Sequence, residues 1–297
     1  MTDRILPLPQ VDDQPLHHVL QVLNLTRTGE TSFTGVSLPE LNNRVYGGQV
    51  MSQALIAAAA TVDREKVGPR LPHSVHGYFL RPGSTQEPIE FAVEVLHDGR
   101  SFSTRRTHAL QRGVPILSMI FSFQLDQPGV EHQVEAPVAP DPETLPSAVD
   151  LFANSDHPAA RLLLRLGAFD LRHVEDPVHL EAAPERKPSQ MLWMRTRQPL
   201  PDRTPQCLHR ALLAYACDQV MLEPVLRAHG LSWLGGISVA SLDHSMWWHR
   251  PVDVSRWLLY VQDSPSAQGG RGLGIARIYS QDGRLVATTA QEGMVRA

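Results

Sequence analysis

Asp218 is the first residue of this sequence whose type and setting suggest chemistry. It lies in residues 207–227, CLHRALLAYACDQVMLEPVLR, whose apolar residues recur at helical spacing. Its neighbours one turn away, Ala214 and Leu222, are apolar, so the carboxylate is expected on the buried face of this helix. A buried carboxylate must receive hydrogen-bond donors or take up a proton. Asp218 is therefore a candidate general base, and the alternative is a structural acid tied to a backbone N–H or an arginine.

The segment SLDHSMWWHRP, residues 241–251, contains the second candidate. If this segment continues the preceding alternation as one strand, Ser241 and Asp243 share one face and His244 lies on the other. Asp243 is a rival acid, because it lies two residues from Ser241 on that face. The two adjacent tryptophans are typical of core or interface packing. His244 and His249 are expected to be structural histidines with satisfied hydrogen bonds.

Gln291 is the third candidate, in the final alternating stretch RLVATTAQEGMV, residues 284–295. It continues the face of Thr289, and a side-chain amide on a buried face needs partners of its own. An amide can donate to a carboxylate and can also orient a water. Asp218, Ser241 and Gln291 could therefore satisfy one another, and three separate local hydrogen bonds are the alternative.

Motifs for other chemistries are absent or wrongly placed. No G-x-S-x-G nucleophile elbow is present, and Ser238 in GISVA lies in a strand pattern where that motif needs a strand-to-helix turn. The glycine-rich stretch GGRGLG, residues 269–274, has neither a strand before it nor a helix after it. His73 and His76, three apart on a strand, face opposite sides. We therefore predict no metal site and no cofactor.

The elements that position these candidates occur twice along the chain. A small-residue helix at 47–62 and the helix at 207–227 are each followed by four alternating strands joined by tight turns. Arg81-Pro82 and Arg250-Pro251 end corresponding strands, at an offset of 169 residues. One helix with a curled antiparallel sheet is the hot dog arrangement, so the pattern predicts an α+β protein with a double hot dog fold.

The predicted organisation has three parts. Residues 1–130 form an N-terminal hot dog repeat, and residues 169–297 form a C-terminal repeat that carries the candidate residues. Residues 131–168 form a proline-rich crossover, because prolines are dense in EAPVAPDPETLP, and a smaller helix at 148–167 belongs to it.

Composition places the chain among globular proteins. It has 297 residues, 42% of them hydrophobic and 20% charged, with a net charge of -4 that gives no footprint for a nucleic-acid partner. Two cysteines, Cys207 and Cys217, are too few for a disulfide framework. The N-terminus lacks a long apolar region, the C-terminus is not a peroxisomal tripeptide, and no run could span a bilayer. We expect a cytoplasmic protein without a membrane partner.

Six stretches together resemble the acyl-CoA thioesterase II family of bacteria and its peroxisomal relatives. The resemblance runs in order from about residue 35 to the C-terminus, with the crossover least alike. The stretches are VYGGQVMSQAL, HSVHGYFLRPG, DGRSFSTRR, LLAYACDQVMLEPVL, SLDHSMWWHRP and QDGRLVATTAQEG.

The resemblance implies a double hot dog fold and hydrolysis of fatty acyl-CoA to free fatty acid and CoA. It also implies a catalytic set of an aspartate on the second helix, a hydroxyl before the Asp-His-Ser segment and a glutamine in the last strand. These positions are Asp218, Ser241 and Gln291. Bacterial members often have threonine where Ser241 stands, so the hydroxyl is kept but rate and geometry can differ.

The mechanism that follows is direct attack by a water. Asp218 would accept a proton from a water held by Ser241 and Gln291, and backbone N–H groups, at a helix start or near the Gly47-Gly48 turn, would stabilise the oxyanion. A serine nucleophile is disfavoured because no histidine is placed to activate it, whereas an anhydride on Asp218 stays an alternative.

The first repeat is expected to lack a site of its own. At the offset of 169, Asp218 corresponds to Gln49, which cannot act as a base at neutral pH. The phosphates of CoA need cations, and Arg100, Arg105 and Arg271 are candidates by type alone; the substrate-binding residues are otherwise unknown.

Two other functions stay open at this point. One is a hot dog enoyl-CoA hydratase, which needs an Asp/His pair on its helix, where the nearest histidines are His209 and His229. The other is a non-catalytic acyl-CoA binding module. A homodimer or homotetramer is expected, because open sheet edges are usually paired with another copy.

Overall fold

The computed structural model describes residues 14–40, 42–62, 68–153 and 155–296. The first ten residues, in which the sequence predicts no signal peptide, lie outside this part. Within the described ranges, no helix is long and apolar enough to cross a membrane.

One 13-stranded antiparallel sheet forms the frame of the molecule, and its two ends come from the two halves of the chain. The N-terminal half supplies β1 (Thr26–Arg27), β2 (Ser32–Gly35), β3 (Arg70–Phe79), β4 (Ile89–Asp98), β5 (Phe102–Gln111) and β6 (Val114–Leu125). The C-terminal half supplies β7 (Phe169–His173), β8 (Ser189–Thr196), β9 (Ser238–Ser241), β10 (Asp243–Trp248), β11 (Leu258–Gln268), β12 (Arg271–Ser280) and β13 (Leu285–Arg296). The order is β1-β2-β4-β5-β6-β3-β10-β13-β12-β11-β8-β7, with β9 beside β13.

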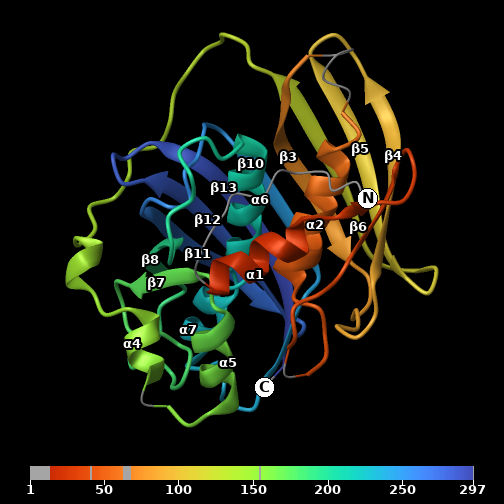
Figure 1. The fold of residues 1–297 in the computed structure, drawn as a ribbon. Helices are drawn as coiled ribbons and strands as arrows, with labels where there is room; N and C mark the ends of the chain where they lie inside the picture. Colours follow the sequence, from red (N-terminus) through yellow and green to blue (C-terminus); the bar gives the residue numbers. More distant parts are fainter. Residues whose placement is uncertain (1–13, 41, 63–67, 154, 297) are drawn as a thin grey trace.

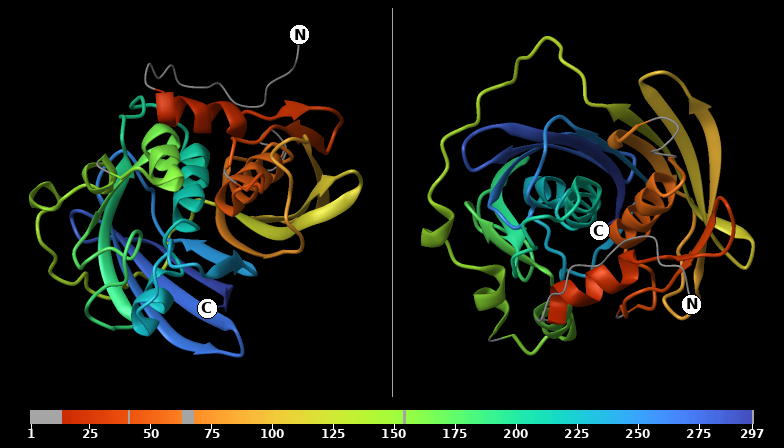
Figure 2. Two further views of the ribbon diagram at one scale, coloured as in Figure 1. Left: turned by 90° about the horizontal axis from the view of Figure 1, so that it is seen from below. Right: turned by 45° about the horizontal axis from the view of Figure 1, so that its top comes forward.

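Each half of the sheet curls around a helix of its own (Figures 1 and 2). The N-terminal half encloses α2, and the C-terminal half encloses α6. The described helices are α1 (Gln14–Leu23), α2 (Gly47–Ala59), the 3-10 turn η1 (Pro142–Thr144), α4 (Ala148–Ala153), α5 (Pro158–Leu166), α6 (Gln206–Cys217) and α7 (Glu223–His229).

The two halves are related by a local two-fold axis that passes between β3 and β10. These strands pair antiparallel with His76 opposite Ser245, and the His76 Nδ1 lies 3.0 Å from the Ser245 Oγ. The Tyr46 hydroxyl donates to the carbonyl of Tyr215 at 2.7 Å. Both pairs are 169 residues apart, the predicted repeat offset, and equivalent residues meet each other only at a two-fold axis.

The two central helices pack directly against each other inside the sheet. All residues from Gly48 to Ala58 of α2 are buried, which explains why this helix carries no charged residue on any side. The Ser52 hydroxyl donates to the Ala211 carbonyl of α6 at 2.7 Å. One hydrophobic core therefore runs through both halves.

The crossover follows the outside of the C-terminal half. No helix or strand lies between Leu125 and η1, and the Gln133 side chain bonds to the backbone of Gly283 and Leu285 in the turn before β13. The single helix predicted at 148–167 is wrong. Two short helices form instead, because Pro158 suits the first turn of a helix but not its interior.

Gly274 of β12 lies where the sheet passes closest to the chain between α6 and α7. A Cβ at this position would lie 1.9 Å from the carbonyl oxygen of Met221, a backbone atom that cannot swing away. Gly274→Ala is expected to lower the free energy of unfolding by about 2–3 kcal/mol through overpacking. Denaturant unfolding measures this change, and Gly129→Ala, where a Cβ meets nothing within 4 Å, is the matched control. Equal effects of the two substitutions would contradict the prediction.

Candidate active site

Asp218 lies at the C-terminal cap of α6, and not inside one long helix as the sequence pattern predicts. The predicted helix 207–227 breaks into α6 and α7, which begins at Glu223. Pro224 in the first turn of α7 explains the break, because a proline cannot continue a helix from the preceding turn. The carboxylate is half-buried, and it faces a cavity from the end of the helix.

Three hydrogen-bond donors converge on the Asp218 carboxylate. Its Oδ1 accepts from the Ser241 hydroxyl at 2.8 Å and from the Gln291 amide nitrogen at 2.8 Å. The same amide nitrogen lies 2.8 Å from the Ser241 Oγ, so the three side chains close a triangle. The Oδ2 accepts from the backbone N–H of Gly48 at 2.8 Å. The structure thus brings together the three candidates that the sequence predicted, and adds a donor from the first repeat.

Gly48 is the contribution of the N-terminal half to this site. It follows the first residue of α2, so the positive end of that helix points at the carboxylate. A Cβ on Gly48 would lie 2.3 Å from the Tyr215 carbonyl, and a Cβ on Gly47 would lie 2.6 Å from Asp218 Oδ2. The two glycines are therefore required by the close approach of α2 to the end of α6.

A β-bulge aims Ser241 at Asp218. Ser241 pairs with Gly293 while Ser245 pairs with Ala290, so the strand carries one extra residue between them. The alternation slips there, and Ser241 points inward together with the buried His244. The prediction that Ser241 shares a face with Asp243 is wrong for this reason.

Asp243 is excluded from the triangle by the same bulge. Its Oδ1 accepts the backbone N–H of Glu292 at 2.7 Å, on the neighbouring strand. This contact joins β10 to β13, so Asp243 has a structural role. Asp243 also does not line the cavity.

Behind the triangle, a buried polar chain continues through His244. The His244 Nδ1 lies 2.6 Å from the Gln291 Oε1, and its Nε2 lies 3.1 Å from the Thr289 hydroxyl. His244, Thr289 and Gln291 are fully buried. Burial lowers the pKa of His244 in spite of its bond to Gln291 and the nearby charges of Asp218 and Asp243. The sequence analysis predicted a structural role for His244 and did not predict its contact with Gln291. The one sequence signal for this contact is that His244 lies three residues after Ser241 in the same segment.

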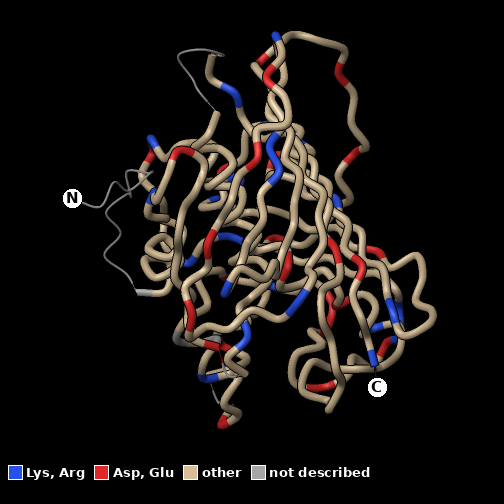
Figure 3. Tube along the Cα trace, turned by 90° about the vertical axis from the view of Figure 1, so that its right-hand side faces the viewer, with Lys and Arg blue, Asp and Glu red and all other residues tan. Residues whose placement is uncertain are grey.

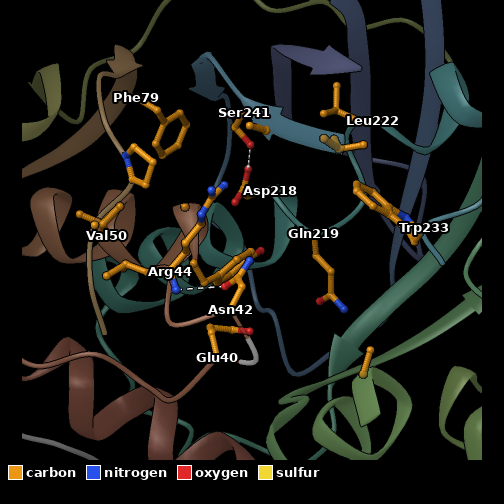
Figure 4. A pocket seen from close by; sticks show the side chains of 18 of the residues that line it. Glu40, Asn42, Arg44, Val50, Phe79, Asp218, Gln219, Leu222, Trp233 and Ser241 are labelled. Atoms are coloured by element: carbon orange, nitrogen blue, oxygen red, sulfur yellow. Dashed lines mark hydrogen bonds between the residues drawn. The ribbon is translucent and has the colours of Figure 1, made fainter. Parts of the chain in front are cut away.

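A cavity of about 580 Å³ opens in front of Asp218 and Ser241 (Figure 4). Both repeats and the crossover line it, mainly with apolar side chains. The apolar lining includes Val50, Phe79, Ile116, Phe152, Ala159, Ala160, Leu222, Trp233 and Val239. Gln291 is not among the lining residues, because it lies behind Asp218.

Two arginines, Arg44 and Arg81, line the cavity and are largely exposed. Neither was a candidate from the sequence. Arg105, which was one, is 1% exposed and pairs with Asp98 at 2.9 Å, so it cannot meet a phosphate at the surface. Arg271 pairs with Glu292 at an N–O distance of 3.0 Å, and neither residue lines the cavity.

Arg100, the remaining sequence candidate, is exposed but does not line the cavity. On the side of the molecule shown in Figure 3, acidic and basic residues are interspersed along the strands. On this side, the pattern of charges gives no second indication of a phosphate site.

Glu40 is the other acidic group of the cavity. It lies near Asn42 and Arg44 below Asp218 in Figure 4. Burial raises the pKa of the Glu40 carboxyl from 4.5 to about 6. Its negative charge is thus partly desolvated in the folded protein at neutral pH.

One group of described residues has the types that could hold a metal ion. The ligand atoms of His173, His179 and Glu223 lie within 4.8 Å of one another. Hydrogen bonds occupy one carboxylate oxygen of this group, since Glu223 Oε2 lies 2.8 Å from His173 Nε2 and accepts from Gln190 at 2.6 Å, whereas Oε1 is buried without a hydrogen-bond partner among the described residues. Burial alone would raise the pKa of Glu223, but the charges of His173 and His179 lower it to about 2. The contacts of Glu223 with His173 and Gln190 fasten α7 to β7 and β8.

Comparison with known proteins supports the same reading of the chain. Residues 37–124 match the family model of the acyl-CoA thioesterase N-terminal domain, and residues 134–295 match that of the C-terminal domain. The acyl-CoA thioesterase 2 of Haemophilus influenzae is 35% identical over 300 residues, covering 95% of this chain and 98% of the relative. The chain belongs to the acyl-CoA thioesterase family.

Other members of the family agree over nearly the whole length. The human acyl-coenzyme A thioesterase 8 is 35% identical, covering 94% of this chain and 88% of that protein. The solved structure of acyl-CoA thioesterase II TesB2 from Mycobacterium marinum has a TM-score of 0.75 at 37% identity, covering 94% and 97% of the two chains. A hot dog protein of Alicyclobacillus acidocaldarius shares the fold, with a TM-score of 0.78 at 19% identity, covering 95% and 98%. The predicted double hot dog fold is confirmed.

The raised pKa of Glu40 predicts a pH-dependent cost to folding. Because the folded state favours the protonated form, ionisation of Glu40 lowers the free energy of unfolding. This loss of stability is absent well below pH 4.5, grows between pH 4.5 and about 6, and is complete at higher pH. Glu40→Gln removes the charge, so it should raise the free energy of unfolding at pH 8 by about 1 kcal/mol, after allowance for solvent screening, and change it little at pH 4.5.

Thermal or denaturant unfolding at the two pH values measures this difference. Glu131→Gln, at an exposed position of the crossover, is the matched control and should give no difference between them. A gain for Glu40→Gln that is the same at both pH values would show that desolvation of the charge is not the cause.

Proposed function

We propose that this thioesterase hydrolyses fatty acyl-CoA to free fatty acid and CoA, with Asp218 as the base that activates water. The observation that carries the proposal is the setting of the Asp218 carboxylate. It faces a mainly apolar cavity, and three donors from separate segments, Gly48, Ser241 and Gln291, fix its orientation. Membership of the family supplies the substrate class.

The free hydrogen-bonding capacity of Asp218 suggests where the water binds. Each carboxylate oxygen can accept two hydrogen bonds. Ser241 and Gln291 both donate to Oδ1, whereas Oδ2 receives the Gly48 amide. Since Ser241 and Gln291 bond to Asp218 itself, we assign them the orientation of the base, and the remaining position on Oδ2 to the attacking water.

In the chemical step, Asp218 takes one proton from the water while the water oxygen bonds to the thioester carbonyl carbon. The C–S bond then breaks as the oxyanion collapses, and the leaving thiolate of CoA takes the proton from Asp218, which returns to its ionised form. The developing oxyanion is favoured by the N-terminal end of α2, where Gly47 lines the cavity. The Gly48 N–H donates to Asp218 Oδ2, so it orients the base and does not stabilise the oxyanion.

The hydratase alternative finds little support in the described residues. His209 accepts the backbone N–H of Val254 at 3.3 Å, and neither His209 nor His229 lines the cavity. The binding-module alternative predicts retained affinity for acyl-CoA without thiol release. A site in which the acid and both orienting side chains are in contact favours catalysis over binding alone.

The remaining features of the proposal concern partners and location. We propose a homodimer or homotetramer, because an exposed apolar patch lies on the outer face of the central strands, with Tyr78 62%, Ile120 43% and Trp247 36% exposed. We propose a cytoplasmic location, because two cysteines are too few for a disulfide framework and the thiol of Cys217 is buried.

We also propose the three-part division into residues 1–130, 131–168 and 169–297. Its support is the change of sheet halves between β6, which ends at Leu125, and β7, which begins at Phe169.

Asp218→Asn should lower kcat for palmitoyl-CoA and for a short acyl-CoA by about 10²–10⁴-fold or more, because an amide cannot accept the proton of water. Free-thiol release measures the rate. Asp243→Asn is the matched control: its Oδ1 can still accept the Glu292 N–H, so we expect nearly unchanged kcat. Turnover that is retained in Asp218→Asn, or is lost equally in Asp243→Asn, would contradict the assignment of Asp218 as the base.

A further inference from the structure

His244 contacts the proposed catalytic triangle from behind, where no substrate can reach it. Its ring is fully buried, and its Nδ1 lies 2.6 Å from the Gln291 Oε1. The opposite end of the same amide, Nε2, donates to Asp218 at 2.8 Å and lies 2.8 Å from the Ser241 Oγ. The Gln291 side chain is therefore held at both ends, by the catalytic residues on one side and by His244 on the other.

Proton counting fixes the direction of the bond between His244 and Gln291. The amide oxygen of Gln291 can only accept, so the Nδ1 of His244 carries a proton. Burial lowers the pKa of His244, so the ring is neutral at neutral pH and its Nε2 is an acceptor. The Thr289 hydroxyl lies 3.1 Å from this nitrogen and 3.0 Å from the carbonyl oxygen of Ser245, so two acceptors share its one proton.

The reversed orientation of the Gln291 amide would be unfavourable at both ends. Its oxygen would then lie 2.8 Å from the carboxylate oxygen of Asp218, two acceptors without a proton between them. While Asp218 is ionised, it opposes this reversal itself. Once Asp218 has taken the proton from water on Oδ2, its negative charge is neutralised and the opposition at Oδ1 weakens. The Nδ1 proton of His244 then remains as the contact that keeps the amide in place.

We propose that His244 is a positioning residue of this thioesterase: through the proton on its Nδ1, it fixes the orientation of the Gln291 amide and, through it, the Asp218 carboxylate. The inference rests on the proposed role of Asp218. In this role His244 contacts neither the substrate nor the attacking water, and it acts entirely through Gln291. The requirement is for a donor at the δ position, not for a base or a charge.

The first test is a double-mutant cycle between His244 and Gln291, read as kcat for palmitoyl-CoA. His244→Leu removes the donor at similar bulk and should lower kcat about 10–100-fold with little change in KM. In a Gln291→Ala background the same substitution should change kcat less than twofold, because the group it positions is gone. Equal losses in both backgrounds would mean that His244 supports the fold generally, and would overturn the proposal.

Conservative variants keep the test decisive if His244→Leu folds poorly. His244→Asn places an amide N–H near the position of Nδ1 and should recover much of the lost kcat. Thr289→Val leaves the ring and its Nδ1 proton in place, so it should lower kcat less than His244→Leu does. A loss in Thr289→Val as large as in His244→Leu, or no recovery of kcat in His244→Asn of native stability, would contradict the proposal.

The ring protonation has a readout that does not depend on turnover. In ¹⁵N-histidine-labelled protein, the His244 Nδ1 should have the chemical shift of a protonated nitrogen and Nε2 that of an unprotonated one; the opposite tautomer would overturn the inference. Failure of the proposed function is distinguishable. If Asp218→Asn and Gln291→Ala keep full turnover, the assigned site is wrong, whereas if both lose it and His244→Leu does not, the His244 inference alone fails.

Discussion

The structure depends on satisfying one partly buried carboxylate at the junction of two repeats. Asp218 receives hydrogen bonds from Ser241 and Gln291 of the C-terminal half and from the Gly48 N–H of the N-terminal half. No single repeat contains all of these donors. Because a desolvated carboxylate without donors is costly, the pairing of the halves and the formation of the site are one event.

Several features of the fold serve this junction. The break between α6 and α7 places Asp218 at a helix end, where its carboxylate can meet the start of α2. The absence of side chains at Gly47 and Gly48 allows the helices to approach. The bulge between β9 and β10 turns Ser241 inward. Each device is small and local, and each brings one partner to the same carboxylate.

Much of this arrangement could be predicted from the sequence. The repeat offset of 169 residues predicted how the two halves correspond, and in the structure His76 contacts Ser245 and Tyr46 contacts Tyr215 at that separation. Periodicity placed Gln291 on a buried face, and the resemblance to the family named all three residues of the triangle.

The rest depends on irregularities that periodicity cannot contain. Period-2 alternation assumes an unbroken strand, so the bulge after Ser241 put Asp243 on the wrong face and hid the contact of His244. Helical spacing runs through Asp218 without a sign of the break, although Pro224 was a local warning. Arg105 was a candidate by charge alone, and its burial beside Asp98 is a tertiary property.

The central claim is that water attacks the thioester directly while Asp218 acts as a base. Single-turnover hydrolysis of palmitoyl-CoA in H₂¹⁸O with enzyme in excess, quenched rapidly and followed by mass spectrometry of product and protein, tests it most directly. The account predicts one ¹⁸O in the fatty acid, no acylated protein at any quench time and no ¹⁸O in Asp218. An acyl adduct on Asp218, or ¹⁸O in its carboxylate, would contradict the account and establish a covalent anhydride route instead.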